Sequence, residues 1–421
     1  MEFANFAEAR SILLWGSFAI AFIMGAVVNK TNFCTMGAVS DLVNIGDSGR
    51  MRAWLFAMAI AILGVVILNF FGLANVKQAF PPYTSSQVIW AENILGGVLF
   101  GIGMTLASGC GNKTLVRLGG GNLKSLMVFA IIAIVSYFMM YPFPGTDQTL
   151  MSVLFFNWIR PMAITLKTGQ DLGAVVAGSS AAATADLVIG LFLGLILLAF
   201  VFKSTDFRGK FDNVLGGLVV GVAVLGGWYL SSNVTLNVDG EMYSMNRYMQ
   251  EWEFLADSVA NKPAEARQLS PQSYTFINPM GQTFNYAKSG FDYKILSYGI
   301  MGVFGIILGS LFWSLISKGF RVEWFVNFRD FLNHFIGAIF MGVGGILALG
   351  CTIGQGVTGV STLAIGSFLA FGSIVLGSAI TMKVQYYKMV YEDEATFAKS
   401  LVTGLVDLKL LPGSLRKLDA V

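Results

Sequence analysis

Three cysteines carry the most distinctive chemistry in this chain of 421 residues: Cys34, Cys110 and Cys351. Each ends an apolar segment and begins a turn of small or polar residues, as in GCGNKT from Gly109 and GCTIGQG from Gly350. Because their number is odd and no CxxC pair occurs, the pattern disfavours a disulfide framework. A thiol is a soft, polarisable group and a weak S–H donor. We predict that the three thiols line one pathway.

The alternative is that these thiols only fill space, since a buried lone cysteine usually behaves as a small hydrophobe. Polar neighbours favour the pathway, because hydroxyl, amide and ammonium groups lie close to each cysteine in the sequence. Backbone N–H groups at the start of a helix would further stabilise an anion. The predicted pathway therefore also contains Asn32, Thr35, Asn112, Lys113, Thr114, Thr352 and Gln355.

Lys113 has two interpretations. As a pathway residue it would attract an anion. As a structural residue it would set the topology and extend its ammonium group to the membrane surface. The sequence leaves both open.

An internal repeat contains two of the cysteines. Ile94–Cys110 and Phe335–Cys351 align without gaps, and seven of the seventeen positions are identical. Each apolar copy has about 16 residues, which at about 1.5 Å per residue span roughly 24 Å. That is shorter than the hydrocarbon core of a bilayer, at roughly 30 Å. Short, glycine-interrupted segments at corresponding places of two halves indicate a transport site near the middle of the membrane.

Composition sets the class of the fold. The chain is 55% hydrophobic and only 12% charged, which is typical of an all-α polytopic membrane protein. A net charge of +3 without a basic cluster argues against nucleic acid as a partner. We predict about nine transmembrane helices, with short re-entrant half-helices between them. The nine segments lie near residues 11–28, 53–74, 94–109, 123–143, 185–202, 214–231, 295–316, 335–350 and 361–382.

Basic residues predict the orientation. They gather after the odd-numbered segments, as the positive-inside rule expects of cytoplasmic loops. The N-terminus is then outside, the C-terminus is cytoplasmic, and the two copies of the repeat are inverted. We predict one transmembrane transport domain over residues 1–421, with an extracytoplasmic insertion at 232–294 and a cytoplasmic tail at 383–421.

Three motifs resemble those of the YeeE/YedE family of bacterial membrane proteins. They are FCTMGA (Phe33–Ala38), GCGNKTLVRLGGGNLKSL (Gly109–Leu126) and GCTIGQG (Gly350–Gly356). The nine-segment plan agrees as well, so the resemblance covers most of the chain. It implies a multi-pass protein of the inner membrane that imports thiosulfate through a pathway containing Cys34, Cys110 and Cys351. It also implies a soluble sulfurtransferase as a cytoplasmic partner.

Thiosulfate suits such a pathway, because it is a divalent anion with a soft terminal sulfur. Three thiols in series would pass it along through S–H···S contacts that are weak enough to allow release. The expected partners are therefore a small sulfur-containing anion and membrane lipid.

Two other functions stay open. One is a permease for another small anion or a selenium species, with the cysteines as packing. The other is a membrane redox protein that exchanges thiols or persulfides, which the absence of a CxxC pair disfavours. No G-x-x-x-x-G-K-[ST] loop occurs. We expect a transporter rather than an enzyme, with no cofactor and no metal.

Overall fold

A bundle of long helices forms the body of the protein. The computed structural model describes residues 1–255 and 262–419, and nine helices within these ranges are long and apolar enough to cross a membrane. This confirms the all-α polytopic class, and each of the nine predicted segments overlaps one helix. The helices are α1 (Phe6–Thr31), α3 (Gly49–Phe70), α4 (Trp90–Leu106), α6 (Leu123–Met140), α9 (Ala182–Phe202), α11 (Phe211–Asn233), α15 (Tyr298–Ile316), α16 (Phe328–Leu347) and α17 (Ile365–Val390).

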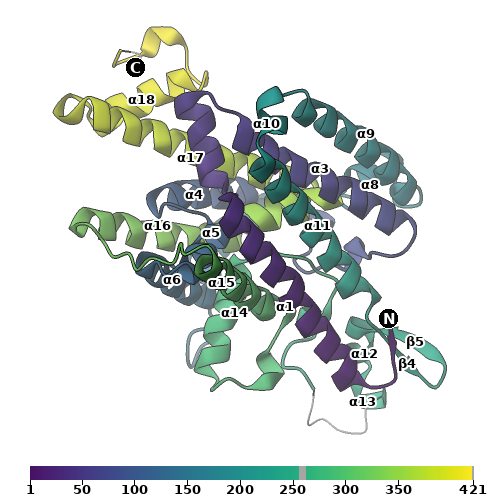
Figure 1. Ribbon diagram of the computed structural model, residues 1–421. Helices are drawn as coiled ribbons and strands as arrows, with labels where there is room; N and C mark the ends of the chain where they lie inside the picture. The colour runs from purple at the N-terminus through teal and green to yellow at the C-terminus, as the bar shows by residue number, and fades with distance from the viewer. Residues whose placement is uncertain (256–261, 420–421) are drawn as a thin grey trace.

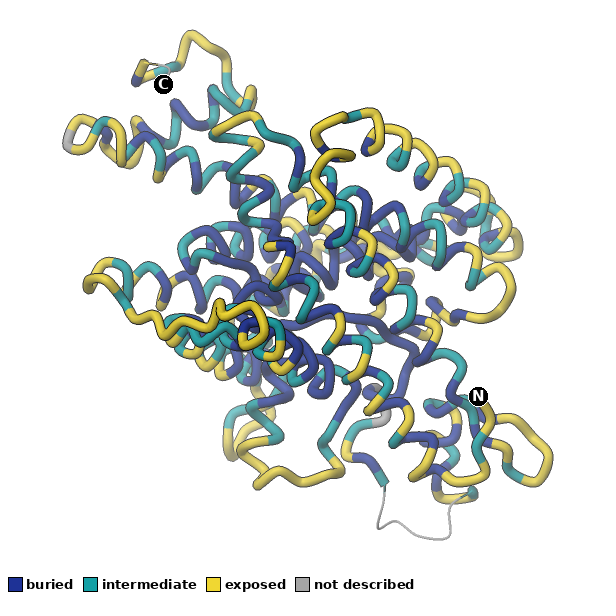
Figure 2. Tube along the Cα trace, in the orientation of Figure 1, coloured by how far each residue is buried: buried dark blue, intermediate teal, exposed yellow. Residues whose placement is uncertain are grey.

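The two ends of the chain lie at opposite ends of the bundle (Figure 1). The first residues form strand β1 (Glu2–Phe3), which pairs in parallel with β4 (Thr235–Val238), and β4 pairs with the antiparallel strand β5 (Glu241–Ser244). The N-terminus therefore lies beside the residues that follow α11. A second small sheet joins β2 (Gln87–Val88) to β3 (Ile164–Thr165). Buried residues concentrate in the middle of the bundle (Figure 2).

The two copies of the repeat pack against each other. A Cβ atom added at Gly96 would lie 2.7 Å from the Gly344 carbonyl oxygen, and one added at Gly103 would lie 2.6 Å from that of Gly337. Helices α4 and α16 are therefore antiparallel and in backbone contact. The sequence alignment equates Gly96 with Gly337 and Gly103 with Gly344, so exchanging the two copies maps one contact onto the other. This is the relation expected of an inverted repeat.

This contact predicts a severe effect of Gly96→Val. The new side chain would meet the backbone of α16, because the Ala348 nitrogen lies only 2.6 Å from an added Cβ. Overpacking typically costs about 1–3 kcal/mol, and a rigid backbone leaves little room for relief. We expect a lower melting temperature and less folded protein in fluorescence-detected size exclusion.

Gly372→Val is the matched control, since nothing lies within 4 Å of a Cβ added on that exposed face of α17. Equal stability of the two variants would contradict close packing of the repeats.

The insertion at 232–294 has two parts. Residues 235–255 form β4, β5 and the short helices α12 (Met245–Gln250) and α13 (Trp252–Leu255) beside the N-terminus. Residues 268–283 run through the interior, where almost all of them are buried. Helix α14 (Ile277–Lys288) then packs on α6 and α16. Part of the insertion therefore belongs to the core of the bundle, and the side of the membrane that it faces stays a prediction.

Candidate functional site

Each cysteine begins a short helix. Cys34 is the N-cap of α2 (Thr35–Ser40), and Cys110 is the N-cap of α5 (Gly111–Gly119). Cys351 directly precedes a helical segment that continues as η7 (Gly354–Gly359), a stretch of π-helix. Each cysteine therefore lies where a long helix ends and a short helical segment begins.

The same backbone turn precedes each cysteine. Asn32, Ser108 and Leu349 each lie two residues before a cysteine and have a left-handed conformation, with φ of 52°, 57° and 57°. Non-glycine residues rarely adopt this conformation, which costs about 1–2 kcal/mol per residue. The turn interrupts the chain between the long helix and the half-helix, so the three thiols occupy equivalent local positions.

Cys110 lies near both of the other thiols. Its side chain is close enough to interact electrostatically with both Cys34 and Cys351, and the Thr352 hydroxyl lies beside it. All three cysteines are free and buried, with exposed fractions of 7% for Cys34, 2% for Cys110 and 0% for Cys351. The structure thus brings together residues that are separated by more than 300 positions in the sequence.

Lys113 lies among the thiols rather than at the membrane surface. Its residue is 8% exposed, and its Nζ atom donates a hydrogen bond of 2.8 Å to Oδ1 of Asn32. The ammonium group interacts electrostatically with both Cys34 and Cys110. This placement favours a role in the pathway over the structural interpretation. Asn32 in turn connects the first cysteine segment to the second.

Several buried polar atoms near the thiols have no partner. Within residues 1–255 and 262–419, a small set of buried side-chain oxygens around the thiols makes no hydrogen bond. Leaving a buried polar atom unpaired costs about 1–3 kcal/mol, so such a cluster is typical of a site that receives a polar ligand. The atoms in this set are Thr35 Oγ1, Tyr83 Oη, Asn112 Oδ1 and Gln355 Oε1. The hydroxyls of Thr275 and Thr352 lie against the thiols of Cys351 and Cys110 instead.

Two of the predicted site residues have partners within their own segment. The Thr114 hydroxyl donates to the Cys110 carbonyl oxygen at 3.1 Å, and the amide nitrogen of Gln355 donates to the Ala348 carbonyl oxygen. The Gln355 oxygen stays unpaired. Thr114 therefore supports the start of α5, whereas Gln355 keeps one atom for a ligand.

Tyr83 and Thr275 were not predicted from the sequence. The Tyr83 hydroxyl and the Thr275 side chain both interact with the Cys351 thiol. Tyr83 comes from the loop before α4, and Thr275 comes from the insertion. One signal was available for Thr275: the twenty residues from Gln268 to Ala287 contain no charge, which is unusual for a segment in water. Nothing comparable marks Tyr83.

Two cavities lie at opposite ends of α4, and each is lined by residues that flank a cysteine in the sequence. The Tyr83 cavity, of about 360 Å³, is lined by Tyr83, Arg160, Leu349 and Gln355 together with other polar residues. Arg160 at its edge pairs with Glu92, with 3.3 Å between Nε and Oε1. The second cavity, named here the Met36 cavity, has about 290 Å³. Its lining comprises Met36, Ser40, Asn44, Thr105, Ser108, Met382, Gln385, Tyr386 and Met389.

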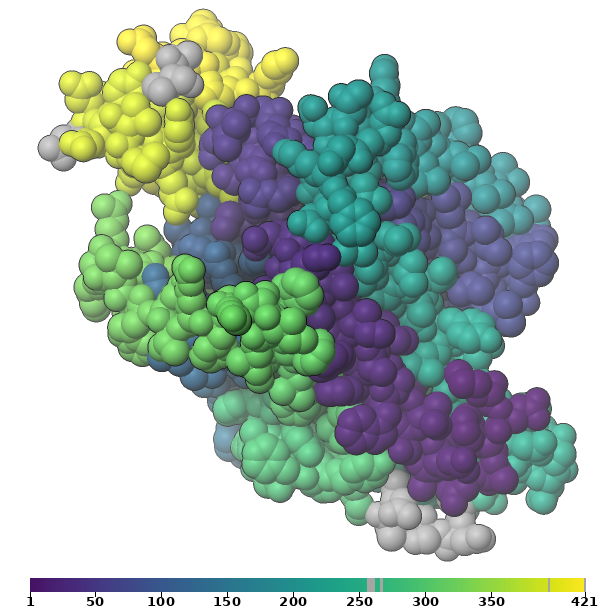
Figure 3. Space-filling view, viewed as in Figure 1, coloured from purple at the N-terminus to yellow at the C-terminus, as the bar shows by residue number. Residues whose placement is uncertain are grey.

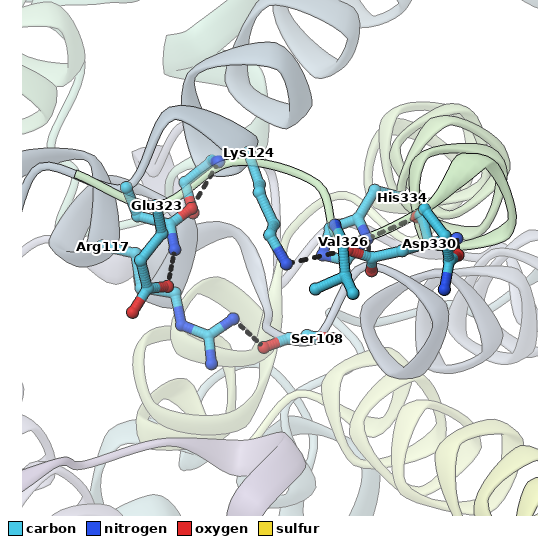
Figure 4. A network of polar contacts seen from close by, with 10 residues as sticks. Ser108, Arg117, Lys124, Glu323, Val326, Asp330 and His334 are labelled. Carbon is cyan, nitrogen blue, oxygen red and sulfur yellow. Dashed lines mark hydrogen bonds and ion pairs between the residues drawn. The ribbon is translucent and has the colours of Figure 1, made fainter. Parts of the chain in front are cut away.

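Arg117 anchors the half-helix α5. Its guanidinium points back to the turn before Cys110 and donates to the Ser108 carbonyl oxygen at 2.6 Å (Figure 4). Beyond α5, Lys124 pairs with Asp330 at 2.8 Å and ties α6 to the first turn of α16. The first contact holds α5 against the turn that precedes it, and the second holds α6 against α16.

Comparison with known proteins agrees with the geometry. A family model described as "Sulphur transport" matches residues 30–380. The chain is 22% identical over 376 residues to a thiosulfate transporter, TsuA, of Spirochaeta thermophila, covering 87% of this chain and 97% of that protein. It is 23% identical over 371 residues to the TsuA of Escherichia coli, covering 84% and 90% of the two chains. It also matches a probable transporter, YedE, of Salmonella typhimurium, with 28% identity over 95 residues, or 22% and 20% of the two chains.

The family model covers all three cysteines, their half-helices and nearly every membrane-spanning helix. The resemblance expected from the three cysteine motifs is therefore confirmed, and the chain belongs to the sulfur-transport family of YeeE/YedE membrane proteins.

Proposed function

We propose that this protein imports thiosulfate through a pathway that joins the Tyr83 cavity to the Met36 cavity by way of Cys351, Cys110 and Cys34. The cluster of unpaired buried oxygens around three free thiols carries the proposal. The names of the relatives supply the substrate.

The thiols and hydroxyls have complementary tasks. A neutral thiol donates a weak S–H hydrogen bond and offers a polarisable surface to the terminal sulfur of thiosulfate. The hydroxyls of Thr35, Thr275 and Thr352 can donate to the sulfonate oxygens. The Lys113 ammonium and the N-terminal N–H groups of α5 offset part of the double negative charge. Each contact is weak enough to be exchanged for the next, as multi-site conduction requires.

The orientation follows from the basic loops. We place the protein in the bacterial inner membrane, with the N-terminus and residues 232–255 outside and the tail from residue 383 in the cytoplasm. The Tyr83 cavity is then the outer entrance, since it lies at the start of α4, and the Met36 cavity is the exit. A cytoplasmic sulfurtransferase would receive the anion there.

Competition tests the substrate. Cells without their own sulfur importers, expressing this chain, should take up labelled thiosulfate. A tenfold excess of sulfate should reduce uptake little, because sulfate lacks the soft sulfur. Equal competition by sulfate would instead favour a general anion permease, and strong competition by selenite would favour a selenium species. Cells that carry the empty vector give the background.

A further inference from the structure

A groove of about 400 Å³ lies beside α4 and α17. It is bounded by α4, α16, α17 and α18 (Phe397–Asp407), the last of which packs on α17. Figure 3 shows a notch on this side of the molecule, between the green surface of α16 and the yellow C-terminal part. Most of the wall is apolar. It contains Val98, Ile102, Leu106, Ile380, Val384 and Leu401.

Two basic side chains stand at one end of the groove. Arg329 lies in the first turn of α16, and Lys388 lies in the last turn of α17. In the parts of the chain that the structure describes, no carboxylate forms an ion pair with either of them. Asp330, the neighbour of Arg329, is bound to Lys124 at 2.8 Å instead. The Lys388 ammonium lies 5.6 Å from the centroid of the Phe397 ring, a contact that does not neutralise its charge. Both positive charges are therefore available to an anion.

The groove has a polar end, where Arg329 and Lys388 lie, and an apolar remainder. Asn333 and Gln385 lie with the two bases in its lining, whereas the α4 wall is apolar from Leu106 to Val98. That wall is about 12 Å long, at about 1.5 Å per residue. A cationic end and an apolar length, both between membrane-spanning helices, match a ligand that has an anionic head and a hydrocarbon tail.

We propose that the groove binds an anionic glycerophospholipid. The phosphate lies beside Arg329 and Lys388, and one acyl chain lies along α4 and α17. Basic pockets between transmembrane helices bind anionic headgroups through the same combination of charge and apolar wall. Gln385 lines this groove and the Met36 cavity alike, so the lipid would support the wall of that cavity.

Native mass spectrometry of the full chain tests the proposal. Purified protein is titrated with phosphatidylglycerol or with phosphatidylcholine of the same acyl chains. We expect preferential retention of phosphatidylglycerol. The double variant Arg329→Gln/Lys388→Gln should weaken its binding about thirtyfold, the combined effect of two basic residues near a membrane surface. The control Lys203→Gln/Arg208→Gln removes two exposed basic residues elsewhere and should bind like the unmodified chain.

A second variant keeps the test decisive if loss of the charges impairs folding. Ile102→Trp fills the apolar length and leaves both bases in place, so it should lose phosphatidylglycerol. Equal retention of the two lipids by the unmodified chain would overturn the proposal. Unchanged binding by a folded Arg329→Gln/Lys388→Gln variant would do so too, as would a lipid-free dimer that covers the groove.

Discussion

Cys110→Ser should abolish most thiosulfate uptake while leaving the fold as stable as before or slightly more stable. Cys110 has an extended backbone at the start of α5, with φ −75° and ψ 175°, and its thiol forms no capping hydrogen bond of normal geometry within the described structure. A serine hydroxyl in this place is a strong N-cap that accepts from the N–H of the third helical residue, here Lys113. The hydroxyl would thus turn toward its own helix and away from the anion.

The expected magnitudes separate transport from packing. A lost donor in a buried site costs about 1–3 kcal/mol, so uptake should fall about tenfold or more. A serine N-cap is worth about 1 kcal/mol over alanine, so Cys110→Ser should melt higher than Cys110→Ala. Radiolabelled uptake at matched expression and thermal denaturation of the purified variants measure both quantities. Full uptake by Cys110→Ser would show that the thiol is packing.

The weakness of sulfur as a cap explains why cysteine suits these positions. Cys34 also begins its half-helix without a side-chain cap in the described structure. Cys351 Sγ accepts from the Gly354 nitrogen at 3.5 Å, a weak contact because sulfur is a poor acceptor. The side-chain oxygen of serine, threonine or aspartate would accept a strong hydrogen bond from a backbone N–H of the first turn, and that bond would hold the side chain against its own helix. A thiol binds these N–H groups only weakly, so the thiol and the N–H groups can exchange their contact for one with a passing anion.

Local patterns made much of the site predictable. Gly109-Cys110 and Gly350-Cys351 end apolar runs, and this was enough to place both thiols at helix breaks. The glycine repeat also marked two inverted segments. Their close packing became visible only in the structure, where small residues at fixed spacing let the helix backbones approach. Hydropathy was sufficient to predict the nine helices. Each membrane-spanning segment must satisfy its own backbone hydrogen bonds in lipid, so its helix can be recognised from that segment alone.

Contacts between distant segments were not predictable. The bond from Lys113 to Asn32 joins residues 81 positions apart, and neither residue type specifies the other. Tyr83 reaches Cys351 from a proline-rich loop that resembles an ordinary surface connection. The left-handed turn at Leu349 is also unexpected, since a leucine rarely adopts it. These features depend on how helices pack, which a single sequence does not encode position by position.

Lys113→Gln should strongly reduce the uptake of thiosulfate, a divalent anion. Glutamine can still donate to Asn32 Oδ1, which keeps the contact between the first and second cysteine segments, but it carries no charge. Lys113 is buried beside Cys34 and Cys110, where a charge is screened far less than in water. Losing a charge-assisted contact of about 1.5–3 kcal/mol predicts a fall in uptake of roughly tenfold to a hundredfold.

Lys30→Gln provides the matched control, because Lys30 lies exposed one turn before Cys34 and contacts only the rings of Phe211 and Trp313 in the described structure. Lys30→Gln removes one positive charge at the C-terminal end of α1, the end that Lys113 contacts through Asn32. A general effect of charge on membrane insertion would therefore appear in both variants. If both lose uptake equally, the charge acts through topology, and Lys113 has no special role. If only Lys113→Gln loses uptake and its melting temperature is unchanged, the buried ammonium stabilises the anion between the thiols.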